Sequence, residues 1–304
     1  MVCRTGIVVA ALLIGGSAAG PVVATGPGTG AGQQASDPLT RPLAVEREST
    51  WLAPRAPEKI FGTTYLVGFG GLSVALIDTG AGLILVDGAL PQAAPRILDN
   101  VRKLGFKPGD IKYILSTEPH FDHAGGLAAL VRDTGATVVA SDRAAEGLRT
   151  GRLGKDDPQL AYDHSFPPVA KVRTLADGER LTLGKVTVTG HRTAGHTTGS
   201  MSWSWPACEG ATCRTIVFAS SLNPVSAEGY RYSAPTSAGI RDAFAQTYAT
   251  MKAMPCDILI TAHADQGGAT GRYLTQPGAC RALAEASERA LAARLRKEAA
   301  GTAE

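Results

Sequence analysis

The chain of 304 residues has little net charge and no run of basic residues. Its 30 Lys and Arg residues nearly balance its 27 Asp and Glu residues, which leaves a net charge of +3. Aromatic residues make up only 6% of the chain, and none of them alternate with Lys or Arg along a segment. Because proteins that bind nucleic acid carry a basic patch or stripe, we expect no nucleic-acid partner.

Long hydrophobic runs are also missing. The apolar stretch at residues 7–14 is too short to cross a bilayer. It follows a charged start and precedes the small residues 17–19, which is the order of a secretory signal peptide. We therefore predict a signal peptide over residues 1–19, cleaved between about Ala19 and Ala24. The mature protein is then expected in the periplasm or outside the cell, without a membrane anchor.

Cysteine is scarce, and one of the five cysteines falls in the predicted signal peptide. The other four are Cys208, Cys213, Cys256 and Cys280. An even count in an exported chain suggests two disulfides, and proximity in the sequence favours Cys208–Cys213 and Cys256–Cys280. Four free thiols are one alternative. A cysteine-rich zinc site is another and a poorer one, because Cys256 and Cys280 are too far apart to supply its second pair of ligands.

The order of the predicted elements indicates a layered α/β domain. Residues 20–45 are rich in Gly, Ala, Pro, Thr and Ser without an apolar period, so we predict a flexible segment there. Over residues 46–304 we predict one domain, an αββα sandwich of two mixed β-sheets with helices outside. The predicted strands cover residues 63–67, 72–77, 82–86, 111–115, 137–140, 180–183, 185–189, 201–205, 215–220 and 257–261. The predicted helices cover residues 91–104, 126–132, 142–148, 241–251 and 281–297.

The last predicted helix is amphipathic. Leu283, Ala286, Ala290 and Leu291 lie along one stripe at helical spacing, and Ser287 is its one polar interruption. We expect this stripe to face the core.

The densest group of reactive side chains follows the predicted strand at residues 111–115. Residues 118–123 read Glu-Pro-His-Phe-Asp-His, and four of these six side chains can bind a metal: Glu118, His120, Asp122 and His123. Pro119 biases Glu118 away from helical backbone. We therefore expect a strand-end loop, in which all four side chains can point inward.

Two more histidines complete a set of six ligands. His196 lies between Gly195 and Thr197, and His263 follows a predicted strand, where loops often carry functional residues. Six ligands suit two zinc ions with three protein ligands each, and this number leaves a position for water, as in catalytic sites. His164 and His191 have no such setting, so we expect structural or surface roles for both.

These segments resemble the metallo-β-lactamase superfamily, whose signature after a strand is His-x-His-x-Asp-His. The resemblance runs from about Trp51 to the C-terminal helix, and Glu118 stands where the signature has its first His. It is strongest to the class B, subclass 3 β-lactamases, which carry a Ser, here Ser221, where other subclasses place a zinc-binding Cys. The matching segments are Trp51-Leu52-Ala53-Pro54, Asp87-Gly88, His123-Ala124-Gly125-Gly126, Gly195-His196-Thr197 and Ala219-Ser220-Ser221-Leu222.

The resemblance implies two groups of metal ligands. The first zinc would be held by Glu118, His120 and His196. The second would be held by Asp122, His123 and His263. A set of two His and one Glu occurs in zinc proteases, so the substitution is chemically sound. Because the carboxylate adds a negative charge, we expect a less Lewis-acidic first zinc; partial occupancy of the first site is the alternative.

The implied reaction is hydrolysis of the β-lactam amide bond of an antibiotic by a metal-bound hydroxide, which Asp122 orients. The chain lacks Ser-x-x-Lys and Lys-Thr-Gly, in agreement with a reaction that needs no covalent acyl-enzyme. A zinc-dependent lactonase of the same superfamily is one alternative, because a fold does not determine an activity. The other alternative is a zinc-binding scaffold whose catalytic activity is weakened by Glu118. We expect a monomer that acts on a small-molecule substrate.

Three further residues receive roles from the same resemblance. Ser221 and Asn223 are the candidates to bind the substrate carboxylate, with ordinary turn chemistry as the alternative. Asp87 is expected to hydrogen-bond a ligand His and to fix its tautomer.

A long segment without apolar period covers residues 149–169. Loops of this length inside a domain are usually functional or disordered. With Tyr162 and Phe166 it is the expected rim over the substituents of the substrate ring; loop packing is the alternative for both aromatic residues.

Overall fold

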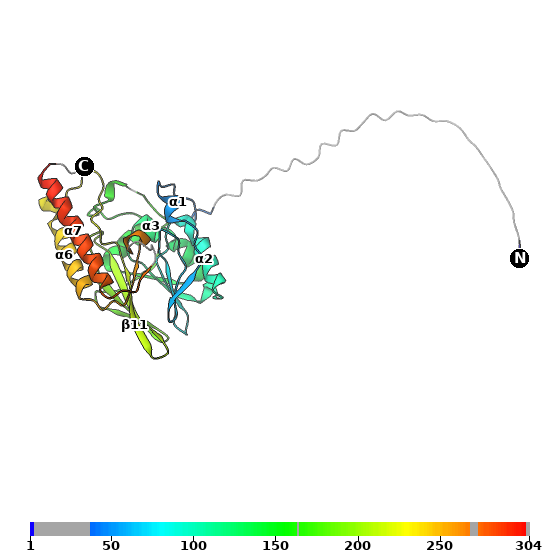
Figure 1. The fold of residues 1–304 in the computed structure, drawn as a ribbon. Coiled ribbons are helices and arrows are strands. Elements are labelled where there is room, and N and C mark those ends of the chain that lie inside the picture. The colour runs from blue at the N-terminus through cyan, green and yellow to red at the C-terminus, as the bar shows by residue number, and fades with distance from the viewer. Residues whose placement is uncertain (3–36, 163, 268–272, 302–304) are drawn as a thin grey trace, which may run out of the picture. The chain divides into compact units, whose positions relative to one another are not determined.

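The computed structural model describes residues 1–2, 37–162, 164–267 and 273–301 (Figure 1). The predicted signal peptide at residues 1–19 and its cleavage site therefore lie outside the described residues, apart from Met1 and Val2. Among the described residues, no helix combines the length and the apolar character needed to cross a membrane.

Two mixed β-sheets form the centre of the described part of the chain, as the sequence predicted. The first has seven strands in chain order, of which β1 to β4 are antiparallel neighbours and β4 to β7 are parallel neighbours. They are β1 (Glu58–Phe61), β2 (Thr64–Leu66), β3 (Ala75–Asp78), β4 (Leu83–Val86), β5 (Ile111–Leu115), β6 (Thr137–Ala140) and β7 (Val172–Thr174).

The second sheet has six strands in the order β13-β12-β11-β10-β9-β8, again counted over the described residues. Its neighbours are antiparallel except for the parallel pair β11 and β12. The strands are β8 (Arg180–Leu183), β9 (Val186–Arg192), β10 (Met201–Glu209), β11 (Thr212–Ala219), β12 (Ile258–Thr261) and β13 (Tyr273–Leu274).

Helices cover the outer faces of both sheets, with α6 and α7 side by side on one face and α2 on the opposite one (Figure 1). The helices are α1 (Glu48–Trp51), α2 (Ala94–Lys103), α3 (Phe121–Ala124), α4 (Leu127–Thr134), α5 (Asp142–Thr150), α6 (Ala238–Ala253) and α7 (Ala279–Ala299).

Alternating side chains along the strands produce this layering. In β4, Leu85 packs toward α2 and α4, whereas its neighbour Ile84 packs between the two sheets. In β11, Phe218 packs between the sheets and Val217 packs toward α6 and α7. Because successive residues of a strand face opposite sides, strands that are apolar throughout must be covered on both faces. The result is the predicted αββα sandwich.

Several strands end at one edge of this sandwich. Parallel neighbours end together, and the last residues of β4 and β5, Val86 and Leu115, are paired. The last residues of β11 and β12, Ala219 and Thr261, are paired in the same way. The amide of Met201 donates to the carbonyl of Thr117 at 2.8 Å and so joins the second sheet to the segment after β5. The segments that follow these strands therefore lie close together.

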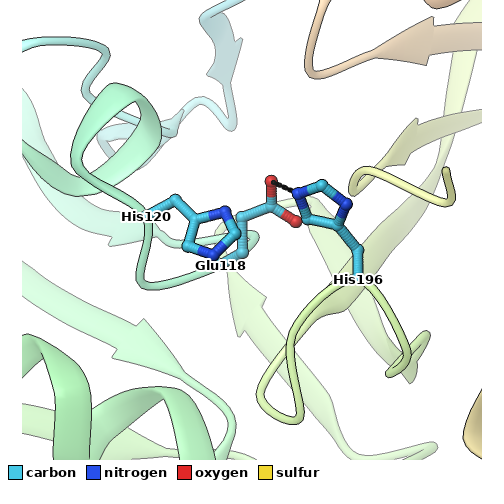
Figure 2. Close-up of side chains that lie close together, drawn as sticks. All are labelled: Glu118, His120 and His196. Carbon is cyan, nitrogen blue, oxygen red and sulfur yellow. Dashed lines mark ion pairs between the residues drawn. The ribbon is translucent and has the colours of Figure 1, made fainter. Parts of the chain in front are cut away.

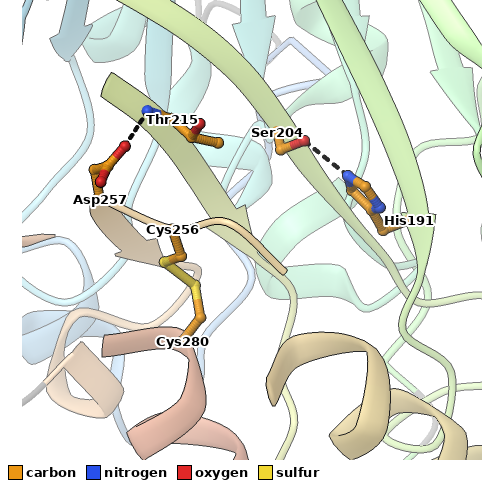
Figure 3. Close-up of a disulfide and its surroundings, with 6 residues drawn as sticks. All are labelled: His191, Ser204, Thr215, Cys256, Asp257 and Cys280. Carbon is orange, nitrogen blue, oxygen red and sulfur yellow. Dashed lines mark hydrogen bonds between the residues drawn. A yellow bond between two sulfur atoms is a disulfide. The ribbon is translucent and has the colours of Figure 1, made fainter. Parts of the chain in front are cut away.

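Both predicted disulfides are present. Cys208 and Cys213 face each other across the β10–β11 hairpin. Cys256–Cys280 ties the residue pair before β12 to the first turn of α7 (Figure 3). Next to it, Asp257 accepts a hydrogen bond from the amide of Thr215 at 2.7 Å, which fixes the start of β12 against β11.

The N-terminal segment differs from the prediction over its described part. Residues 20–45 were predicted to be flexible, but Leu39, Leu43 and Val45 are partly buried against the core on the α2 side. Asp37 pairs with Arg132 at 2.6 Å. Three apolar residues spaced along a Pro-rich segment are enough to attach it, although they show no helical or strand period.

The last helix buries a different stripe from the predicted one. Ala284, Ser287 and Leu291 are buried, whereas Ala286 and Ala290 are exposed. The carbonyl of Ser287 accepts a hydrogen bond from the hydroxyl of Tyr248 at 3.3 Å. The polar interruption is therefore part of the buried face, where its backbone carbonyl contacts α6.

Candidate metal centre

The six candidate ligands gather at the edge where these strands end. Glu118 and His120 lie in the connection after β5, and Asp122 and His123 lie in the single turn of α3. His196 comes from the connection between β9 and β10, and His263 follows β12. All are buried except His263, which is half-buried.

The segment at residues 118–123 is only partly the predicted loop. Glu118 and His120 have no regular structure, but the amides of His123 and Ala124 donate to the carbonyl of His120 and close a helical turn. A side chain added at Gly125 would meet the carbonyl of Phe121 at 2.4 Å and Pro91 at 2.5 Å. The glycine therefore allows close packing after α3; its φ of −57° is ordinary.

Asp122, His123 and His263 converge on one point. The distances are 3.1 Å from His263 Nε2 to Asp122 Oδ2, 3.1 Å from His123 Nε2 to His263 Nε2 and 3.5 Å from His123 Nε2 to Asp122 Oδ2. A zinc ion with ligands at 2.0–2.1 Å in a tetrahedron separates its ligand atoms by about 3.3 Å. This triad therefore fits a tetrahedral zinc site with one open position.

Glu118, His120 and His196 form the second group, whose ligand atoms lie within 4.8 Å of one another. Figure 2 shows the carboxylate of Glu118 between the two imidazoles. Glu118 Oε1 is 3.9 Å from His196 Nε2 and 3.2 Å from His123 Nε2, so this oxygen faces both triads. It is buried and has no hydrogen-bond partner among the described residues. An unpartnered carboxylate oxygen in this position fits a metal ligand.

Three of the four imidazoles have one nitrogen engaged away from the triads. His196 Nδ1 is 2.8 Å from the carbonyl oxygen of Asn223, and His120 Nε2 is 3.2 Å from Asp157 Oδ2. His123 Nδ1 is 3.4 Å from Asp87 Oδ2. Metal-binding histidines typically donate their other N–H to a carbonyl or a carboxylate in this way. His196 and His123 therefore present Nε2 to the triads and His120 presents Nδ1; Nε2 of His196 also lies 3.0 Å from Nε2 of Gln159.

The position of Asp87 agrees with its predicted role, and its backbone is strained. Its φ of 65° lies in the left-handed region, which costs a residue other than glycine of order 1 kcal/mol or more. Its carboxylate accepts hydrogen bonds from the amide and the hydroxyl of Thr117, both at 2.7 Å. These two bonds hold the carboxylate against His123.

The ligand side chains determine one another's charge. Burial alone would raise the pKa of Glu118, but the charges of His196, His123 and His120 lower it to about 2. Burial alone would likewise raise the pKa of Asp122, but His123 and His263 lower it. In His123, burial is outweighed by Asp122 and Glu118, which raise its pKa to about 10. Each ionised carboxylate in this buried site favours a positive charge beside it, either a protonated imidazole or a bound cation.

A pocket of about 570 Å³ opens above both triads. This volume is within the range of small-molecule sites. The lining residues are Val45, Glu46, Arg47, Trp51, His120, Phe121, Asp122, Gln159, Tyr162, His164, His196, Asn223, Val225, His263, Asp265 and Gln266.

The structure brings most, but not all, of the other predicted residues to this pocket. Asn223 and Tyr162 line it, and Ser221 is buried beside Glu118, to which its amide donates at 3.2 Å. Phe166 is only 5% exposed and packs in the core, so it does not belong to the rim. The loop folds back at this point, because the amide of Phe166 donates to the carbonyl of Gly151.

Of the two histidines predicted to be structural or on the surface, one is at the site. His164 lines the pocket and contacts Phe121 with ring centroids 4.6 Å apart. His191 instead pairs with Ser204 Oγ at 2.7 Å on the neighbouring strand, in agreement with a structural role (Figure 3).

Three residues of the site had no signal in the sequence. Asp157 contacts His120, Gln159 Nε2 lies 3.0 Å from His196 Nε2, and Ser200 Oγ donates to Glu118 Oε2 at 3.2 Å. Asp and Gln in a polar loop and Ser in a turn are common everywhere. Only the folding of distant segments onto the triads distinguishes them.

The chain matches a family model described as the metallo-beta-lactamase superfamily over residues 67–263. A solved structure described as the first B3 metallo-beta-lactamase with an active-site glutamic acid is 65% identical, with a TM-score of 0.85 over 86% of this chain and 98% of that chain. BJP-1, a subclass B3 metallo-beta-lactamase of Bradyrhizobium japonicum, is 34% identical, with a TM-score of 0.74 over 84% of this chain and 99% of that chain.

Curated relatives match over a shorter stretch. An N-acyl homoserine lactonase of Bacillus cereus is 34% identical over an alignment of 77 residues, with a coverage of 18% of this chain and 31% of that protein. The chain thus matches about a third of the length of these lactonases. The family model includes every candidate ligand, and the two solved structures cover 86% and 84% of this chain. The chain belongs to the metallo-β-lactamase superfamily and, within it, to the subclass B3 metallo-β-lactamases.

Proposed function

We propose that this protein hydrolyses the amide bond of β-lactam antibiotics with two zinc ions, one at each triad. One observation carries the proposal: two adjacent buried triads form the floor of a pocket of small-molecule size. The similarity over nearly the whole length of a B3 metallo-beta-lactamase with an active-site glutamic acid supports it.

The proposed ligands follow the two groups. Glu118, His120 and His196 would hold the first zinc. Asp122, His123 and His263 would hold the second. Zinc, when bound, would lower the pKa of a water molecule to about 7 and polarise a carbonyl oxygen.

The side chains of the protein would position the reactants. Asp122 lines the pocket, so the oxygen that does not face the second triad can accept a hydrogen bond from the attacking water and orient it. Ser221 and Asn223 each have a buried polar side-chain atom without a partner in the described part of the chain. The unpartnered atom of Ser221 is its hydroxyl oxygen, whereas that of Asn223 is Oδ1, which only accepts. We assign the hydroxyl of Ser221 to the substrate carboxylate, because buried polar groups normally have partners. We assign Asn223 to it because this residue lines the pocket, where its Nδ2 amide can donate.

Glu118 would make the first site more negative than a triad of three histidines. The added charge reduces the Lewis acidity of the first zinc, and it is the reason to measure the occupancy of each site separately.

We further propose that the protein is exported through the segment at residues 1–19 and works as a monomer in the periplasm or outside the cell. The two disulfides support export, because disulfides persist in oxidising compartments.

A lactonase activity is the second candidate, because N-acyl homoserine lactonases are among the curated relatives. The test is parallel hydrolysis of a penicillin, a cephalosporin, a carbapenem and an N-acyl homoserine lactone, with zinc content measured on the same sample. We expect β-lactam turnover that stops when a chelator removes the zinc. Turnover of the lactone alone would replace the proposal, and β-lactam turnover without metal would contradict it.

A further inference from the structure

The carboxylate of Glu118 is held at one oxygen and free at the other. Oε2 accepts a hydrogen bond from the hydroxyl of Ser200 and one from the amide of Ser221, both at 3.2 Å. Oε1 has no hydrogen-bond partner in the part of the chain that the structure describes, and its ion-pair contacts are with candidate ligands of both triads, His123 and His196. All three residues are fully buried. The two oxygens therefore have different surroundings, and the donors at Oε2 determine which oxygen can reach a metal.

The hydroxyl of Ser200 has one hydrogen, and its neighbours direct that hydrogen to Glu118. An ionised carboxylate only accepts hydrogen bonds, so Ser200 must donate to it. Thr197 Oγ1 lies 2.9 Å from Ser200 Oγ and itself accepts from the amide of Gly199 at 3.1 Å. The hydroxyl hydrogen of Thr197 is therefore donated to Ser200 Oγ. The amide of Thr197 also donates to Ser200 Oγ, at 3.3 Å. The bonds run in one direction, from Gly199 through Thr197 and Ser200 to Glu118.

The turn that carries Ser200 is fixed in place. A side chain at Gly199 would meet the amide nitrogen of Ala144 in α5 at 2.5 Å, so the turn packs directly on this helix. The carbonyl of Gly199 accepts from the hydroxyl of Ser141 at 2.7 Å. Because packing and hydrogen bonds on α5 hold the turn, Ser200 can impose a position on Glu118 instead of following it.

We infer that Ser200 is a positioning residue that makes Glu118 a one-oxygen metal ligand: its hydroxyl occupies Oε2 and leaves Oε1 to bind. This inference rests on the proposed metal centre. A neutral imidazole at position 118 has no second oxygen to restrain, so the role of Ser200 belongs to the glutamate form of the site.

The test is zinc binding by Ser200→Ala, measured for both sites by competition with a chelator after metal removal. Loss of a residue that orients a ligand typically weakens metal affinity 10- to 100-fold, and we expect one of the two zinc dissociation constants to rise by roughly this factor. The matched control is Ser202→Ala. Ser202 is equally buried and bonded to Thr193 Oγ1 at 2.8 Å and to the amide of Ser220 at 3.1 Å, without a bond to Glu118. We expect this control to keep the zinc constants of the unmodified protein.

A double-mutant cycle separates positioning from a general loss of structure. In the Glu118→His background, Ser200→Ala should no longer change the zinc constants, because the carboxylate through which it acts is gone. Thermal unfolding of the metal-free variants checks that each is folded, and Ser200→Gly replaces the alanine variant if that one is not. Two results would overturn the inference: an equal loss of zinc affinity on Ser200→Ala in both backgrounds, or unchanged zinc dissociation constants with Glu118 in place. Neither result would contradict the proposed hydrolysis. Failure of the unmodified protein to bind zinc would remove the metal centre and this inference together.

Discussion

Glu118 carries the charge that distinguishes the first triad from a set of three histidines. Its carboxylate is buried and ionised, and its Oε1 lies near a histidine of each triad. A negative ligand donates more charge to a metal than a neutral imidazole does. In the proposed centre, the charge at the first metal therefore depends on this residue.

Glu118→His should retain β-lactam hydrolysis and change the zinc content of the first site. Replacing an anion by a neutral ligand makes the metal more Lewis-acidic, so water at the site should ionise at lower pH. We expect the acid limb of the pH–rate profile to move to lower pH, measured by initial rates with a cephalosporin. Elemental analysis of the same samples gives the zinc content. An unchanged acid limb together with unchanged zinc content would show that Glu118 is not a ligand.

Asp157→Ala should weaken zinc binding by roughly 10- to 100-fold, because the carboxylate holds His120 with Nδ1 free for the metal. The measurement is competition with a chromophoric chelator. Asp156→Ala is the matched control, since this neighbour pairs with Arg143 on the surface at 2.9 Å. Equal zinc affinity in the two variants would contradict the assignment.

The sequence was sufficient to find the six candidate ligands. Four of them form one short motif, and the other two are isolated histidines. One lies in the connection between two strands, and the other directly follows a strand. Asp157 and Ser200 could not be found in this way. Each is an ordinary polar residue, and only the return of its loop to the triads gives it a role. Phe166 shows the opposite error: an aromatic residue in a long polar loop can be core.

At the scale of the elements, α7 is fastened by a buried carboxylate. Glu298 is only 4% exposed and accepts hydrogen bonds from the amides of Tyr232 and Ser233 at 3.1 and 2.7 Å and from Arg294 at 2.8 Å. Burial alone would raise the pKa of Glu298, but these donors lower it below its ordinary value of 4.5. A single residue thus joins the end of the helix to the loop before α6.

Glu298→Gln should lower the free energy of unfolding at pH 7 by about 1.5–3 kcal/mol, the range for a hydrogen bond to a charged group. A pKa that is lower in the folded state stabilises the protein above the unfolded pKa of about 4.5, and this contribution is lost as the pH falls through the lower folded pKa. The difference in the free energy of unfolding between the variant and the unmodified protein should therefore decrease as the pH falls. Denaturant titrations at several pH values measure it.

The control for this prediction is Glu288→Gln, since Glu288 is about half-exposed and pairs with Lys252 on the surface. Surface ion pairs contribute about 0–1 kcal/mol. If the loss of unfolding free energy in Glu298→Gln does not exceed that of the control, or stays constant from neutral to acidic pH, the carboxylate does not hold the helix end in place.

Long strands and helices were predictable because their apolar residues repeat with a clear period. The turn of α3, the short helix α1 and the edge strand β1 were not predicted, because their four residues show no apolar period, unlike the equally short strands β6 and β8. The buried stripe of α7 was misplaced for a different reason. Helical spacing alone cannot tell which of two neighbouring stripes packs on the core, and here the stripe with Ala284, Ser287 and Leu291 does.

At the scale of the whole molecule, the sandwich creates the site. Each sheet contributes candidate ligands from the segments after its strands, and neither sheet alone carries a complete triad. The order of strands and helices predicted the two sheets and their outer helices. It did not predict which strand ends would meet, because that depends on how the sheets pack.

Because the ligands come from distant parts of the chain, zinc should stabilise the entire domain. A ligand that binds only the folded state at 100 times its dissociation constant adds about 2.7 kcal/mol. We expect the metal-free protein to unfold at a lower temperature than the zinc-loaded protein, measured by thermal denaturation, and added zinc to restore the higher value. An unchanged unfolding temperature would show that zinc does not bridge these segments.

Anomalous diffraction at the zinc absorption edge, on crystals grown with excess zinc, tests the central claim most directly. Two peaks are predicted, one surrounded by Glu118, His120 and His196 and the other by Asp122, His123 and His263. A map with no peak among these six side chains would contradict the account.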